Sequence, residues 1–377
     1  MTDIINELKT IGQSIWYDNI ERKLLDDGTL AGMIERGEIR GITSNPSIFN
    51  NAISNSNEYD KEIESLTRKG VTKEDIYEQL AVRDIQRAAD LFLPLYQETK
   101  GGDGYVSLEV SPFLAHETDR TISDAKKLWK MVDRPNLMIK IPATLEGLPA
   151  VTEVIAAGIN VNVTLIFSLS RYQAVMEAYL AGLEKRIQEG EKIDGVSSVA
   201  SFFISRIDAK VDSQLEEILD KTADGEKDHV KGLFGKAALA SGKLAFEAYE
   251  ENFGDQANRF GELRGSGANK QRALWASTST KNPQYPDTLY VDGLIGPDTV
   301  NTVPPKTLVA FFDHGKVEQS IDKDINNAKN VFKDLAEAGI DMEDVAADLE
   351  SEGVKAFAVA FTSLLDSIYD RMQEFQS

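Results

Sequence analysis

The chain has 377 residues, of which 42% are hydrophobic, and its 41 basic and 62 acidic residues leave a net charge of −21. This length fits two domains or one large α/β barrel with insertions, and the apolar fraction is enough for a buried core. The acidic balance argues against nucleic acid or an anionic membrane as partner, because such surfaces are bound through a basic footprint. The acidic net charge is compatible with a small phosphorylated substrate, since a few local hydrogen-bond donors can hold it.

The chain has no cysteine, which excludes disulfides, thiolate nucleophiles and zinc–thiolate sites. Its three histidines, His116, His229 and His314, disfavour a Ser–His–Asp triad and a multi-histidine metal site. The first residues, MTDIINELKTIG, lack the basic region and apolar run of a secretory signal. No stretch approaches the ~18 consecutive apolar residues of a membrane span. We therefore expect a cytoplasmic protein that does not contact a membrane.

Short apolar or β-branched runs alternate with longer segments of helical period. A helix is expected at Asp3–Ile11, and the clearest later helix runs from Ser170 to Glu189, with its apolar residues on one stripe. Eight strands are expected, at Ser14–Ile20, Arg40–Asn45, Tyr105–Val110, Leu137–Ile141, Asn160–Phe167, Ser198–Ile204, Ala273–Ser277 and Val300–Val303.

Eight strands that alternate with helices, without a dividing linker, predict a single (β/α)8 TIM barrel over residues 1–377. Additional helices are expected in the long connections and in a helical C-terminal tail, residues 316–377. That tail could cover the mouth of the barrel or join a second subunit, so a homodimer is one possibility. The alternative fold is a doubly wound open sheet, but the glycine-rich phosphate fingerprint that would favour it is absent.

Polar residues recur where the expected strands end, which is where a barrel of this type carries its active site. Core barrel strands are otherwise apolar on both faces, so these residues together predict a polar pocket. They are Asp18, Asn45, Glu109, Lys140, Asn162, Thr164, Ser201 and Ser277.

Lys140 lies within the apolar run Met138–Pro142, and lysine is rarely buried without a partner. One interpretation is a strand-end lysine whose amine reaches water. The other is a Schiff-base nucleophile, because burial disfavours the ammonium, lowers the pKa and frees the amine to attack a carbonyl.

Asp18 and Glu109 offer the acid–base chemistry that a Schiff base and carbon–carbon cleavage need. Either carboxylate could instead cap a helix or form a salt bridge. The polar residues Asn45, Asn162, Thr164 and Ser201 could likewise make ordinary strand-end hydrogen bonds.

Five segments resemble motifs of the transaldolase family, in the order found in that family. They are GITSNPS at 41–47, SLEV at 107–110, LMIKIPA at 137–143, NVNVTLIF at 160–167 and GPDTVNTVP at 296–304. The resemblance runs from about Asp18 to about Gly315. It implies transfer of a dihydroxyacetone unit from sedoheptulose 7-phosphate to glyceraldehyde 3-phosphate, giving erythrose 4-phosphate and fructose 6-phosphate. It implies sugar phosphates as partners and no metal or organic cofactor.

The resemblance also implies a role for each matching residue. Lys140 matches the Schiff-base lysine, and Asp18 matches the aspartate that exchanges the sugar hydroxyl proton. Glu109 and Thr164 match a pair that moves protons through a bound water. The matching substrate-binding residues are Asn45, Asn162, Ser201, Phe203 and, at the phosphate end, Arg206.

The segment after the seventh expected strand departs from the family pattern. Many members carry a phosphate-binding arginine two residues after the serine of that strand, and here this position is Ser279. We expect Ser277, Ser279 and Lys281 to share the phosphate with Arg206, although Lys281 could also be a solvated loop residue.

Two alternative functions remain open. A lysine-dependent fructose-6-phosphate aldolase would release free dihydroxyacetone, and the chain length and long tail favour transaldolase over it. A non-catalytic sugar-phosphate-binding barrel would form no covalent adduct.

Overall fold

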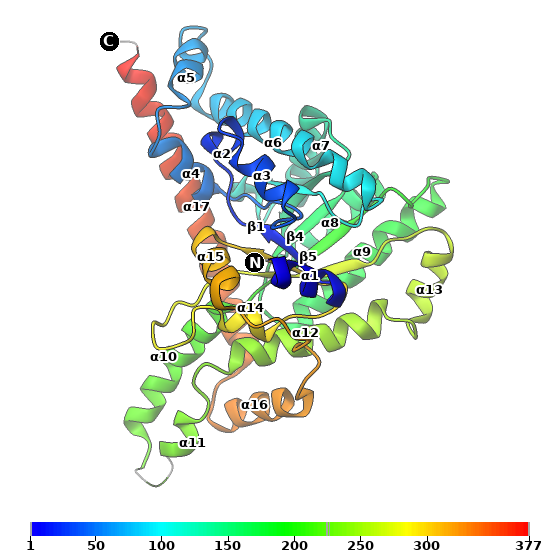
Figure 1. Ribbon diagram of the computed structural model, residues 1–377, viewed down its shortest axis with the longest axis vertical. Coiled ribbons are helices and arrows are strands. Elements are labelled where there is room, and N and C mark those ends of the chain that lie inside the picture. Colours follow the sequence, from blue (N-terminus) through cyan, green and yellow to red (C-terminus); the bar gives the residue numbers. More distant parts are fainter. Residues whose placement is uncertain (1, 224, 226, 376–377) are drawn as a thin grey trace.

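The computed structural model describes residues 2–223, 225 and 227–375 (Figure 1). Its seven strands form one parallel sheet in the order β1-β7-β6-β5-β4-β3-β2. The strands are β1 Ser14–Tyr17, β2 Val106–Glu109, β3 Leu137–Pro142, β4 Val161–Ile166, β5 Ser198–Phe203, β6 Gln271–Ala276 and β7 Val300–Val303. A parallel α/β fold is therefore present, as the alternation of strands and helices predicted.

The strand expected at Arg40–Asn45 is not present as a strand, and this expectation is corrected. Ile42 alone forms isolated parallel bridges, one to Tyr17 and one to Val106. The segment still lies between the two end strands, because Ile42 donates to the Tyr105 carbonyl at 2.9 Å and accepts from the Ser107 amide at 3.1 Å.

A close contact with Trp16 and an early helix start explain why this pairing is short. Gly41 approaches the indole of Trp16 so closely that a Cβ there would lie 2.7 Å from the ring. Four residues later Asn45 caps helix α4 (Pro46–Ser54), accepting from the Ile48 amide at 2.9 Å. Proline at the first helical position also favours a helix start. The chain thus turns from strand to helix within a few residues.

Helices connect the strands and cover the sheet. In the first half they are α1 Thr2–Ile11, α2 Arg22–Asp26, α3 Thr29–Glu35, α5 Asp60–Thr67, α6 Lys73–Glu98, the 3₁₀ turn η1 Pro112–Leu114, α7 Thr118–Val132, α8 Gly147–Ala156 and α9 Leu169–Gln188. In the second half they are α10 Ser205–Lys221, α11 Lys227–Lys231, α12 Ala237–Phe253, α13 Asn258–Gly265, α14 Leu289–Gly293, α15 Pro305–His314, α16 Ile325–Glu337 and α17 Met342–Glu374. Residues 1, 224 and 226 of the expected domain and residues 376 and 377 of the expected tail lie outside the described part.

The buried sheet positions the functional residues. Every residue of β3, β4 and β5 is buried, as expected for parallel strands that are covered on both faces. The helices α7, α8, α9 and α12 pack directly on strands. A polar side chain at the end of such a strand is therefore held in a rigid, dry setting.

Helix α17 is the longest element of the tail and lies alongside α4, α5 and α6 (Figure 1). It also packs against α10 and β4, so it reaches the carboxyl ends of the strands. Gly353 permits this approach, because a Cβ there would lie 2.9 Å from Leu165. Among the described residues, no helix is both long enough and apolar enough to pass through a bilayer.

Candidate active site

A cavity of about 180 Å³ lies at the carboxyl ends of the strands, where the sequence placed the polar residues. All the expected site residues line it except Glu109 and Asn162. The lining residues are Asp18, Thr43, Asn45, Lys140, Thr164, Ser201, Phe203, Arg206, Ala276, Ser277, Ser279, Lys281, Thr302, Pro304 and Phe357.

Lys140 projects into this cavity from β3, and its side chain is 7% exposed. Its Nζ donates to the carbonyl oxygen of Ser44 at 2.9 Å and lies 3.5 Å from a carboxylate oxygen of Glu109. The apolar setting expected from the sequence is thus only partly present, since two oxygens accept from the amine. A buried primary amine at the edge of a cavity is in position to meet a carbonyl carbon.

Asp18 follows β1 and lines the same cavity. Burial raises the pKa of its carboxyl group, while a hydrogen bond from Thr43 and the charges of Lys140 and Lys281 oppose this rise. The Thr43 hydroxyl donates at 2.7 Å. A carboxyl group whose pKa is raised above its ordinary value is suited to accept and return a proton.

Glu109 ends β2 and contacts the amine of Lys140 without lining the same cavity. Burial raises the pKa of its carboxyl group, and Lys140 opposes this rise. The carboxylate lines a second cavity on the far side of this contact. Two carboxyl groups with raised pKa values therefore lie near one lysine.

Thr164 reaches the cavity through a distortion of β4. The register between β4 and β5 shifts between Val163 and Ile166, and Leu165 has a positive φ of 59°. Such a bulge re-aims side chains next to functional sites. The Thr164 hydroxyl is buried with no hydrogen-bond partner among the described residues. It is therefore free to bind a ligand or a water.

Asn162 does not line the cavity but bonds to a residue that does. Its side-chain oxygen accepts from Ser201 at 2.6 Å, and its amide nitrogen donates to the Ser107 hydroxyl at 3.2 Å. This network links β2, β4 and β5. Asn162 thereby fixes the orientation of Ser201, which does line the cavity.

Two cationic side chains gather at one end of the cavity. The guanidinium of Arg206 lies 5.2 Å from the ring centroid of Phe203, and burial lowers its pKa. The amine of Lys281 donates to Ser279 at 2.9 Å, and its pKa is lowered by burial and then by Arg206. Within the described ranges neither has a carboxylate oxygen inside 4.0 Å, so both charges are available to an anion.

The loop that carries Lys281 begins with a strained residue. Ser277 has a positive φ of 55°, and its hydroxyl lies 3.0 Å from that of Ser205 at the start of α10. Non-glycine residues in this region of φ are uncommon and cluster at functional sites.

The sequence reasoning missed several lining residues, among them Thr43, Thr302 and Phe357. Thr43 could have been predicted from the sequence, because strand alternation puts it on the same face as Asn45. Phe357 could not, since it reaches the site from α17 only through tertiary packing.

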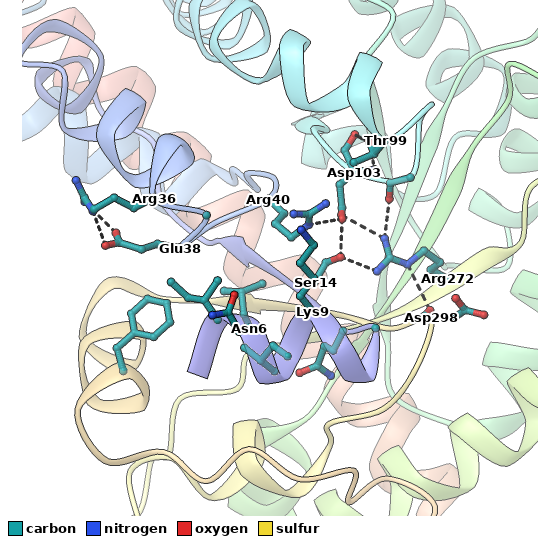
Figure 2. A pocket seen from close by; sticks show the side chains of 18 of the residues that line it. Asn6, Lys9, Ser14, Arg36, Glu38, Arg40, Thr99, Asp103, Arg272 and Asp298 are labelled. Atoms are coloured by element: carbon teal, nitrogen blue, oxygen red, sulfur yellow. Dashed lines mark hydrogen bonds and ion pairs between the residues drawn. The ribbon is translucent and has the colours of Figure 1, made fainter. Parts of the chain in front are cut away.

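A larger cavity of about 500 Å³ lies near the amino ends of β1 and β6 (Figure 2). There Asp103 accepts from Arg40 at 2.6 Å and from the Ser14 hydroxyl at 2.7 Å, and Arg272 lies 3.2 Å away. These charges thus pair with one another around the buried Asp103 and connect the starts of β1 and β6. The smaller cavity, with its amine and unpaired cations, is the better candidate for catalysis.

No cluster of three or more His, Cys, Asp or Glu suited to a metal ion occurs in the described residues.

Comparisons with known proteins show the family of the chain. The family model described as transaldolase/fructose-6-phosphate aldolase matches residues 15–368. A transaldolase of Trichodesmium erythraeum is 46% identical over 377 aligned residues, which cover 99% of each chain. A transaldolase of Saccharopolyspora erythraea is 46% identical over 371 residues, 98% of each chain. A transaldolase of Mycolicibacterium smegmatis is 46% identical over 361 residues, 96% of this chain and 95% of the relative. The chain therefore belongs to the transaldolase/fructose-6-phosphate aldolase family.

Proposed function

We propose that the chain is a transaldolase that carries a dihydroxyacetone unit as a Schiff base on Lys140. The observation that carries this proposal is the buried Lys140 amine, which lies in a cavity between two carboxyl groups of raised pKa. The alignments with the relatives cover almost the whole chain. Both relatives are named transaldolase, which supports the same reaction.

The first half of the reaction forms the Schiff base. The Lys140 nitrogen attacks the ketone carbon of the donor sugar, and the resulting carbinolamine loses water. Glu109, 3.5 Å from the amine, exchanges the protons through a water held by the free Thr164 hydroxyl. Asn45, Ser201 and, through Ser201, Asn162 orient the sugar hydroxyls.

The second half cleaves and remakes a carbon–carbon bond. Asp18 removes the proton of the hydroxyl on C4 of the donor, the bond between C3 and C4 breaks, the aldehyde leaves, and the electron pair remains on the lysine-bound enamine. An acceptor aldehyde then takes the three-carbon unit as Asp18 returns the proton. Water hydrolyses the new Schiff base, which releases the product ketose and regenerates the Lys140 amine. By this route sedoheptulose 7-phosphate and glyceraldehyde 3-phosphate give erythrose 4-phosphate and fructose 6-phosphate.

Arg206 and Lys281 bind the phosphate of the sugar, with Ser277 and Ser279 as additional donors. Arg206 is half-buried and Lys281 is exposed, and neither has a carboxylate oxygen within 4.0 Å among the described residues, which favours an anionic ligand. Phe203 packs against Arg206 and helps to fix its position.

The proposal extends to the fold. The segment around Ile42 lies between β1 and β2 and bonds to both, so it would close the seven-stranded sheet into a single-domain (β/α)8 barrel. A cytoplasmic location and a homodimer stay predictions. A native mass measurement would test the homodimer.

Borohydride reduction in the presence of fructose 6-phosphate tests the covalent step. A stable adduct on the peptide that contains Lys140 is expected, and Lys140→Arg should abolish both adduct and turnover. Lys126→Met, at an exposed lysine of α7, serves as the control that retains both. Absence of an adduct from active protein would indicate another mechanism, and absence of both adduct and turnover would favour the non-catalytic alternative.

Fructose-6-phosphate aldolase is the second candidate, because the family description includes it. The two reactions share the enamine and differ in its fate. A transaldolase should transfer the unit to glyceraldehyde 3-phosphate much faster than it releases free dihydroxyacetone without an acceptor. Equal rates with and without acceptor would assign the aldolase reaction.

A further inference from the structure

A second cavity, of about 330 Å³, lies on the far side of Glu109 from the catalytic cavity, and the two share no lining residue. It is bounded by α6, η1, α7, α17 and the end of β2. We call it the acidic–aromatic cavity. Its lining residues are Pro46, Glu74, Tyr77, Glu78, Ala81, Val82, Leu108, Glu109, Val110, Ser111, Pro112, Phe113, Asp124, Leu128, Phe361 and Leu365.

Three aromatic rings from three separate elements form one part of its wall. The ring of Phe361 on α17 lies 5.1 Å from that of Tyr77 on α6 and 5.5 Å from that of Phe113 in η1, both edge to face. Phe113 is 53% exposed, which is unusual for so large an apolar side chain. An occupant of the cavity would cover part of this ring.

The charges of the wall all have one sign. Four carboxylates line the cavity, Glu74, Glu78, Glu109 and Asp124, and no basic side chain does. Lys127 neutralises Glu78 from outside at 2.5 Å, and Lys140 approaches Glu109 at 3.5 Å from the catalytic side. Asp124 accepts only from the Ser111 amide among the hydrogen bonds of the described residues, at 3.0 Å.

These features select the chemistry of the occupant. A phosphate or carboxylate would meet repulsion from this wall. A neutral apolar molecule would take water from the carboxylates without replacing it, which costs free energy. An organic cation would meet both requirements, because ammonium groups bind to aromatic faces and pair with carboxylates.

We propose that the acidic–aromatic cavity binds a small organic ammonium compound. Its cationic head lies against the rings of Tyr77, Phe113 and Phe361 and near the carboxylates of Glu74 and Asp124. Its apolar body rests on the aliphatic floor formed by Leu108, Leu128 and Leu365. The volume suits a small molecule, at the lower end of the roughly 300–1,000 Å³ of ligand sites. The sugar-phosphate chemistry uses no such ligand, and the two cavities share no lining residue, although Glu109 of this wall contacts Lys140.

A matched pair of probes tests the charge requirement. Choline and 3,3-dimethylbutan-1-ol have the same shape and differ only in a charged nitrogen in place of a carbon. Titration of the full chain, followed by ligand-observed NMR at constant ionic strength, should give saturable choline binding about tenfold or more tighter than that of the alcohol. Equal binding of the two would show an ordinary apolar pocket, and no saturable choline binding would refute the site. Either result overturns the proposal.

Substitutions test where choline binds and distinguish the contribution of the aromatic rings from that of the carboxylates. Phe113→Ala removes one exposed ring and should weaken choline binding about threefold to tenfold, in line with one cation–π contact. Glu74→Gln keeps the packing and should weaken choline but not the alcohol. Tyr369→Ala, at an exposed aromatic of α17 outside the cavity, is the control and should change neither. Choline binding that is unchanged in both Phe113→Ala and Glu74→Gln would place it elsewhere and overturn the assignment.

Discussion

The hydroxyl of Thr43 donates to the carboxylate of Asp18 at 2.7 Å, and Thr302 contacts the same hydroxyl from β7. Thr43 lies in the segment between β1 and β2, so the bond joins two neighbouring parts of the cavity floor. A donor to a carboxylate favours its ionised form. Thr43 therefore opposes the rise in the pKa of Asp18 that burial causes.

In Thr43→Val, protonation should inactivate Asp18 as a base at a higher pH than in wild type. Without the donor the pKa of Asp18 rises further, so the carboxylate is protonated over more of the acidic range. The acid limb of kcat/KM should move upward by about one pH unit, given the strength of hydrogen bonds to charged groups. Thr302→Val leaves the direct donor in place and should produce a smaller move. An identical limb in wild type and Thr43→Val would remove Asp18 as the titrating base.

Lys281→Met should weaken the binding of phosphorylated sugars. Loss of a charge-assisted contact costs about 1.5 kcal/mol or more, so KM for fructose 6-phosphate should rise about tenfold or more. KM for unphosphorylated fructose should be little affected, which separates phosphate binding from general damage. Lys126→Met, at an exposed lysine, is the matched control. An unchanged KM in Lys281→Met would take this lysine out of the site.

Tyr285 holds the Lys281 loop against the helix that carries Arg206. Its hydroxyl donates to Asp212 of α10 at 2.6 Å. Tyr285→Phe removes this bond and should loosen the spacing of the two cations. We expect KM for fructose 6-phosphate to rise about threefold to fivefold at unchanged kcat, because one hydrogen bond contributes about 1 kcal/mol. Tyr369→Phe serves as an exposed control, and a fall in kcat with constant KM would point to another role.

Asp208 should make the folded protein less stable as the pH rises. Burial raises the pKa of its carboxyl group to about 6 from an ordinary value of 3.8, although Ala238 and Tyr290 donate to it. Between these values the folded chain binds more protons than the unfolded chain, so the free energy of unfolding falls as pH rises. The free energy of unfolding that depends on protonated Asp208 is lost progressively from about pH 4 to pH 6.

Asp208→Asn should remove that dependence, because an amide keeps the shape of the side chain but does not ionise. The free energy of unfolding of the variant minus that of wild type should increase by about 1 kcal/mol from pH 5 to pH 7. Urea unfolding at both pH values measures this. Asp370→Asn, at an exposed aspartate, should show no such gain. Parallel curves for wild type and Asp208→Asn would contradict the assignment of Asp208 as the responsible group.

Much of the strand pattern could be predicted because it is encoded locally. The apolar runs around Lys140 and Thr164 match β3 and β4 closely, and helix Ser170–Glu189 corresponds to α9 within a residue at each end. The expected strand at Arg40–Asn45 failed for a non-local reason. Its residues have strand character, but the contact of Gly41 with Trp16 and the early start of α4 leave only Ile42 in a bridge.

By itself the sequence determined which groups are available to the chemistry: one lysine in an apolar strand, no thiol, few imidazoles, and polar residues at strand ends. Parallel strands bring their carboxyl ends to one edge, so these residues had to gather. Tertiary structure alone decided that Glu109 faces a second cavity, that Asn162 supports Ser201 from below, and that Phe357 joins the site from α17. The physical reason is that strand periodicity sets the face on which a side chain lies, whereas contacts with distant segments set what it meets there.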